Sequence, residues 1–150
     1  MENTDLKVKN AVCCHKDGFN CAQAVFSTYA KELGIDHTTA LKVSAAFGGG
    51  ISRRGETCGA VTGALMVIGF RAGQIYAEDK AAKERTYELG KEFMKKFKLR
   101  NNLLLCRELL GHDISTPEGL KAIKENDLSD ICNRLIKNSI EILDDLPSNP

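Results

Sequence analysis

The chain has 150 residues, of which 21 are Lys or Arg and 20 are Asp or Glu, so its formal net charge is +1. This length suits one domain that buries a sizeable core without crosslinks. The balanced charge, with no block of like charges, excludes the electrostatic footprint of a nucleic-acid-binding protein.

Helical periodicity and the absence of alternating strand-like runs predict an all-α protein. From residue 19 to 33, apolar side chains recur at steps of three and four, which predicts an amphipathic helix. A second helix is expected from Thr38 or Thr39, where a hydroxyl can cap it, to Phe47. The three glycines at 48–50 then break this helix.

The glycine-rich loop leads into a third helix, predicted from Glu56 or Thr57 to about Arg71. Gly59 and Gly63 stand four residues apart, so they share one face of this helix. We therefore expect another helix to approach its backbone closely along that face.

The second half of the chain contains further helical segments, of which residues 79–98 show the clearest amphipathic pattern. The others are expected at residues 103–110, after a cap at Ser115 or Thr116, and at about 129–143. Together the segments predict a compact single-domain bundle of about six to seven helices over residues 1–150. Residues 1–17 are expected to form an N-terminal extension and residues 144–150 a frayed tail.

Six cysteines are many for a chain of this length: Cys13, Cys14, Cys21, Cys58, Cys106 and Cys132. In a reducing cytosol such a density indicates metal or redox chemistry more often than a disulfide framework. Helical spacing places one cysteine on the core-facing side of each of four predicted helices, namely Cys21, Cys58, Cys106 and Cys132. Buried free cysteine also packs as a small hydrophobic residue, so a structural role is the alternative.

Cys58 lies where the glycine-rich loop becomes a helix, with Arg53 and Arg54 just before it. The helix dipole and these charges are expected to lower the pKa of the Cys58 thiol and make it the attacking sulfur. The alternative is that both arginines only solvate the loop. Cys13 and Cys14 are adjacent and point in different directions on a helix, so at most one of them can join the site.

The first ten residues, "MENTDLKVKN", contain acids and no apolar stretch after them, which argues against a secretory signal. The longest apolar stretch, from Gly59 to Phe70, is too short to cross a bilayer. We therefore expect a cytoplasmic protein without membrane insertion and without a nucleic-acid partner.

Four segments carry a resemblance to a known family: "GFNCAQAVFSTYAKELGI", "FGGGISRRGETCGAVTGALMVIG", "CRELLGHDI" and "DICNRLI". In this order they resemble the C_GCAxxG_C_C family, small and mostly prokaryotic proteins that are described as redox-active. The resemblance runs from about Gly18 to the last helix. It places the family's four cysteines on Cys21, Cys58, Cys106 and Cys132, and implies redox chemistry without a specific reaction.

A related domain occurs in split-Soret cytochromes, where cysteines of this kind are associated with an iron–sulfur centre. The resemblance therefore leaves such a centre open for this chain. Haem is not implied, because the sequence has no C-x-x-C-H attachment motif.

Three functions fit these cysteines. The first is thiol/disulfide exchange or electron transfer by an oxidoreductase that serves a redox partner protein, with Cys58 attacking and Cys21, Cys106 or Cys132 as its partner. The second is a metal-binding electron carrier, in which the four cysteines hold an iron–sulfur cluster or a zinc ion. The third is a non-enzymatic helical binding module with structural cysteines. The sequence fixes no cofactor, and a homodimer is compatible with each function.

Overall fold

The computed structural model describes residues 2–147, which form nine α-helices, one short 3-10 turn and no named strand. The α-helices are α1 (Thr4–Lys16), α2 (Cys21–Thr28), α3 (Ala30–Leu33), α4 (His37–Ser44), α5 (Gly59–Ala72), α6 (Lys80–Asn101), α7 (Cys106–Leu110), α8 (Pro117–Glu125) and α9 (Ser129–Asp145), and the turn η1 is Ala45–Phe47. The predicted all-α fold is confirmed, with more helices than the expected six to seven. No helix within this range is both long and apolar enough to span a membrane.

One additional helix arises because the segment predicted as a single helix at 19–33 is divided at Tyr29. The Tyr29 N–H donates to the Phe26 carbonyl oxygen, which closes α2 with a tighter turn before α3 begins. The start of α2 is fixed by a capping box between Asn20 and Gln23. The expected cap of the next helix at Thr38 or Thr39 is wrong, because the Asp36 carboxylate accepts a hydrogen bond from the Thr39 N–H instead.

The N-terminal segment expected as an extension contains α1, which packs against α2 and α9. A charge network around the buried Lys7 ties it down: Lys7 is 4% exposed and lies 3.0 Å from Glu32 and 3.1 Å from Asp144. The Tyr29 hydroxyl donates to the same Asp144 carboxylate at 2.8 Å. Asp144 therefore belongs to α9, which ends at Asp145, and Leu146 directly after the helix is buried. Of the predicted tail, residues 148–150 lie outside the described residues.

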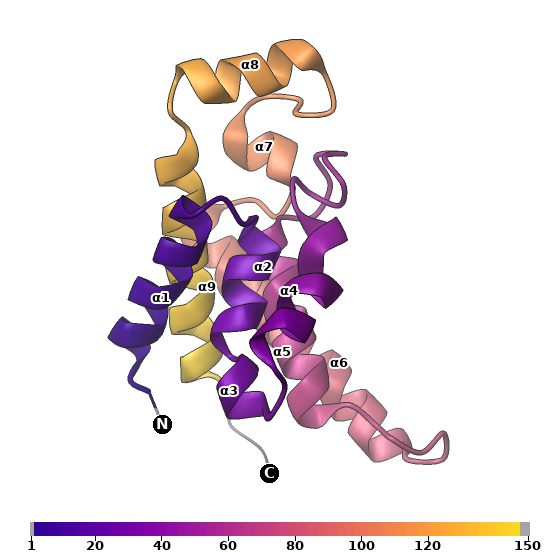
Figure 1. The fold of residues 1–150 in the computed structure, drawn as a ribbon. Coiled ribbons are helices and arrows are strands. Elements are labelled where there is room, and N and C mark those ends of the chain that lie inside the picture. Colours follow the sequence, from indigo (N-terminus) through magenta and orange to yellow (C-terminus); the bar gives the residue numbers. More distant parts are fainter. Residues whose placement is uncertain (1, 148–150) are drawn as a thin grey trace.

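Helix α5 lies at the centre of the main core, where α2, α6 and α9 pack around it (Figure 1). Its glycines allow α2 to come close: a Cβ built on Gly63 would lie 2.8 Å from the Ala22 carbonyl oxygen, and one on Gly59 would lie 2.8 Å from the Ala22 nitrogen. The predicted close approach of a second helix is therefore confirmed. On another side, the Ser139 hydroxyl of α9 donates to the Ala60 carbonyl oxygen at 2.7 Å.

A second, smaller core is formed by α7, the loop after it and side chains of α8 and α9. Helices α7 and α8 lie at one end of the bundle (Figure 1). Its buried members are Cys106, Leu110 and Ile114. Ile131, near the start of α9, packs against both cores. The two cores therefore meet beside the first turns of α9.

The close approach of α2 to α5 predicts opposite effects for two glycines of α5. Gly63→Ala should lower the free energy of unfolding by about 1–2 kcal/mol, because overpacking against the Ala22 backbone outweighs the gain in helix propensity. Gly69→Ala, whose added Cβ meets nothing within 4 Å, should raise it by about 0.5–1 kcal/mol. Urea unfolding of both variants measures the difference. Equal effects at the two positions would contradict the proposed packing.

Candidate functional site

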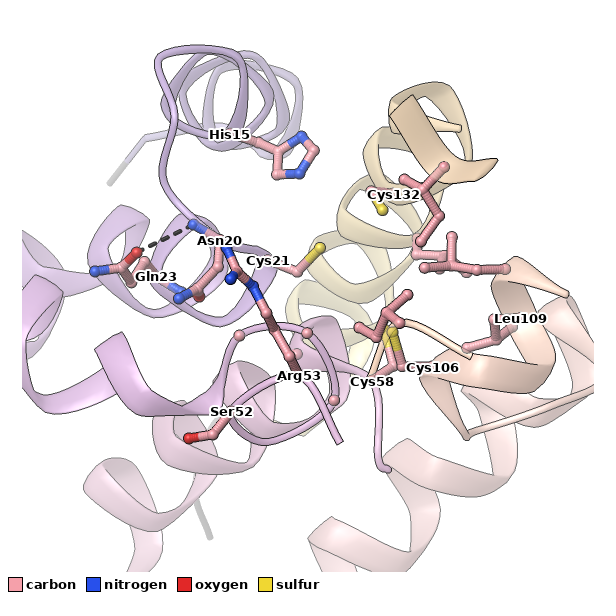
Figure 2. Close-up of a pocket in the computed structure, with 18 of the residues that line it drawn as sticks. His15, Asn20, Cys21, Gln23, Ser52, Arg53, Cys58, Cys106, Leu109 and Cys132 are labelled. Atoms are coloured by element: carbon pink, nitrogen blue, oxygen red, sulfur yellow. Dashed lines mark hydrogen bonds between the residues drawn. The ribbon is translucent and has the colours of Figure 1, made fainter. Parts of the chain in front are cut away.

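A cavity of about 530 Å³ lies where the two cores meet. The four cysteines predicted from helical spacing all line it, together with a histidine that sequence reasoning missed: Cys21, Cys58, Cys106, Cys132 and His15 (Figure 2). These residues come from four helices and the residue that precedes a fifth. All six cysteines of the chain carry free thiols. The fold thus brings four distant thiols and one imidazole to a common space.

Backbone pairing between two loops places Cys58 and Cys106 on the same wall of the cavity. The Cys58 N–H donates to the Leu104 carbonyl oxygen at 2.8 Å, and the Cys106 N–H donates to the Glu56 carbonyl oxygen at 2.6 Å. Between these bonds Thr57 and Leu105 form an isolated antiparallel bridge. The two cysteines are therefore positioned by main-chain hydrogen bonds that do not depend on their side chains.

The glycine-rich loop beside this pairing has an unusual backbone. Residues 49–53 all have φ between 52° and 68°, the left-handed region, including the β-branched Ile51. Each residue with a Cβ costs about 1–2 kcal/mol in this region. Hydrogen bonds such as the one from the Glu56 N–H to the Gly50 carbonyl oxygen at 2.9 Å hold the loop in place. The result is a tight coil that brings Arg53 to the cavity.

The prediction that Cys58 is the low-pKa thiolate is wrong. Helix α5 begins at Gly59, so Cys58 precedes its first turn, and its side chain is only 3% exposed. Burial raises the pKa of Cys58 to about 12, although backbone N–H groups of the first turn act in the opposite direction. Arg54 does not compensate, because its side chain is turned toward Glu56 at 3.7 Å. Burial likewise raises the pKa of Cys106 to about 11.

The favoured thiolate is Cys132, in the first turn of α9. A hydrogen bond from the Cys21 thiol is the largest of the effects that lower the pKa of Cys132, and His15 lowers it further. The same contact raises the pKa of Cys21, because a thiol beside a thiolate loses its proton less readily. The pair therefore holds one shared proton on Cys21 and the negative charge on Cys132.

His15 reaches the pair from the last turn of α1 (Figure 2). Its Nδ1–H donates to the Asn133 amide oxygen at 2.8 Å. The other ring nitrogen, Nε2, is therefore the one that remains to interact with Cys132. A hydrogen bond with Cys132 raises the pKa of His15, so the imidazolium and the thiolate stabilise each other. The sequence offered one weak signal, the histidine in "CCHK", because no spacing links residues 15, 21 and 132.

The neighbouring cysteines do not join this site. Cys13 is exposed, and Cys14 is partly buried with its sulfur 3.8 Å from the Ser27 hydroxyl. Neither lines the cavity. Burial raises the pKa of the Cys14 thiol, which makes it a poor nucleophile at neutral pH.

The same three side chains could hold a metal ion. Within residues 2–147, His15, Cys21 and Cys132 form a group whose ligand atoms all lie within 4.8 Å of one another. A tetrahedral zinc ion bound at about 2.0–2.3 Å needs ligand atoms roughly 3.5 Å apart, so a small adjustment would complete the geometry. The donor set differs from the predicted four cysteines, because one imidazole nitrogen joins two sulfurs and Cys58 and Cys106 fall outside the group.

Comparison with known proteins agrees with this cysteine-centred site. Residues 19–146 match the family model described as "Putative redox-active protein (C_GCAxxG_C_C)". The chain therefore belongs to this family, as its four sequence segments indicated. Comparisons with curated proteins and with solved structures gave no match.

The lowered pKa of Cys132 predicts that this thiol stays reactive in mildly acidic solution. Between about pH 8 and 6 its alkylation by iodoacetamide should slow little, whereas an unperturbed thiol slows about tenfold per pH unit. His15→Gln removes the imidazole, so the pKa of Cys132 rises and alkylation near pH 6 should fall by roughly tenfold. Mass spectrometry of the Cys132 peptide after timed quenching measures the rates.

The exposed His37, which does not line the cavity, provides the control for this experiment. His37→Gln should leave the pH profile of Cys132 unchanged. A wild-type profile that falls steadily from pH 8 would contradict the assignment of Cys132 as the thiolate.

Proposed function

We propose that this member of the C_GCAxxG_C_C family is a thiol/disulfide redox protein in which Cys132 is the nucleophile and Cys21 is its resolving partner. One observation carries the proposal: two thiols and an imidazole meet within 4.8 Å, and their contacts favour the charge on Cys132. A thiolate beside a protonated thiol is the arrangement that disulfide exchange requires. Both residues are of intermediate exposure and line the cavity, so a disulfide can approach them from that side.

The exchange runs in two steps that balance without a further reactant. The Cys132 thiolate attacks one sulfur of a disulfide R–S–S–R, so that a Cys132–S–R bond forms and RS⁻ leaves, with the His15 imidazolium available to protonate it. Cys21 then gives its proton to His15 or solvent and attacks the Cys132 sulfur, which releases the second RS⁻. Two protein thiols become one disulfide, and the substrate disulfide becomes two thiols.

Cys58 and Cys106 are suited to a different role in this proposal. Both are buried with raised pKa values, so they stay protonated at neutral pH and react slowly. They line the same cavity as the reactive pair. We assign them to shaping and shielding the cavity, with disulfide exchange confined to Cys21 and Cys132.

Two cysteine variants distinguish the nucleophile from its partner. With a small neutral disulfide, Cys21→Ser should accumulate a stable mixed disulfide on Cys132, because the second step has no attacking thiol. Cys132→Ser should form no such adduct in the cavity. Intact-mass and peptide mass spectrometry after quenching at low pH identify the modified residue.

Cys13→Ser serves as the matched control, because Cys13 is exposed and lies outside the cavity. This variant should form the internal disulfide as the wild-type chain does. An adduct found mainly on Cys58 would overturn the assignment.

A second function is supported by the same group of donor atoms. His15, Cys21 and Cys132 could bind zinc or another soft divalent metal with three protein ligands and one open position, a pattern typical of reactive rather than structural zinc sites. Bound metal would occupy the thiolate and suppress disulfide exchange until it is released.

Cobalt(II) titration of the anaerobic, reduced protein tests the metal site. Binding should give thiolate-to-cobalt charge-transfer absorption, and His15→Gln should weaken the affinity by about tenfold or more. Cys58→Ala should leave the affinity within about twofold, because Cys58 lies outside the donor group. A loss of binding in Cys58→Ala as large as in Cys21→Ser would instead support a four-cysteine site.

A further inference from the structure

The cavity that holds the reactive thiols has a one-sided charge. Of the residues in the described part of the chain that line it, His15 and Arg53 are basic and none is a carboxylate. Much of the remaining wall consists of apolar side chains of α7, α8 and the loop between them. An electropositive pocket of this kind concentrates anions and disfavours cations.

Arg53 is placed to use this charge. Its side chain extends from the glycine-rich loop toward Asn20 and Cys21 at the exposed edge of the cavity (Figure 2). Among residues 2–147 it makes no ion pair, in contrast to Arg54, whose guanidinium lies 3.7 Å from the Glu56 carboxylate. The guanidinium of Arg53 is therefore available to a ligand, with a planar set of donors that matches a carboxylate.

We infer that the substrate of the Cys21–Cys132 dithiol is a low-molecular-weight disulfide with carboxylate substituents, and that Arg53 binds one of these carboxylates. The inference rests on the proposed disulfide exchange and adds the substrate class. A cavity of about 530 Å³ suits a small molecule of this type. The substrate is reduced to two carboxylate-bearing thiols, and the two protein thiols are oxidised to one disulfide.

Three disulfides that each carry two methylene groups between sulfur and the terminal group differ in charge and only slightly in size. Dithiodipropionate carries two carboxylates, bis(2-hydroxyethyl) disulfide is neutral, and cystamine carries two ammonium groups. The rate of Cys132 modification by each is measured at neutral pH for the wild-type chain, Arg53→Asn and Arg54→Asn. Asparagine is chosen because it tolerates the left-handed backbone of residue 53, where φ is 63°.

Arg53→Asn should slow the reaction with dithiodipropionate by about 5- to 10-fold and leave the neutral disulfide within about twofold. Arg54→Asn, the matched control, should change neither rate by more than about twofold. In the wild-type chain, added salt should slow the anionic disulfide more than the neutral one. This salt comparison tests the inference even if the loop variant folds poorly.

The outcomes separate the two proposals. If Cys132 reacts with all three disulfides and Arg53→Asn changes their rates equally, the substrate class is wrong and the exchange function stands. Preference for cystamine in the wild-type chain would overturn the substrate class as well. If Cys132 reacts with none of the three, the proposed function itself fails.

Discussion

The site depends on the close packing of α2 against α5. Gly59 removes the side chain that would otherwise separate them, since a Cβ there would lie 3.1 Å from the Cys21 Cβ. Cys21 is the first residue of α2, and Cys58 is the residue before α5. Two helix starts are therefore held side by side, each contributing one thiol. A larger residue at position 59 would push apart the backbone on which both sulfurs depend.

Burial and hydrogen bonding then give the four cavity thiols different pKa values. Cys58 lies at a helix start, where backbone N–H groups favour a thiolate. Its burial nevertheless raises the pKa of the thiol by more than these groups lower it. Cys132 is partly exposed and receives two specific contacts, from the Cys21 thiol and from His15. Specific hydrogen bonds thus decide which sulfur carries the charge, and burial decides which sulfurs do not.

Sequence patterns predicted the parts of the molecule that local rules control. The amphipathic segment at 79–98 corresponds to α6, capped by Asp79, and the spacing of Gly59 and Gly63 correctly predicted a close helix contact. The helical spacing also correctly predicted that four cysteines face the inside of the protein, where they line one cavity. The sequence did not predict how deeply Cys58 is buried or that His15 joins the site, because both depend on contacts between helices that lie far apart in the sequence.

The histidine that lowers the pKa of Cys132 comes from a different part of the chain than the cavity cysteines. The family match covers residues 19–146, which include all four cavity cysteines, whereas His15 lies before the match, on α1. Helix α1 is anchored by the ion pairs of the buried Lys7 with Glu32 and Asp144, about two turns away from the histidine. Docking of α1 places the His15 imidazole beside Cys132, where it lowers the pKa of the thiol. The Lys7 ion pairs help to hold the helix that carries this imidazole.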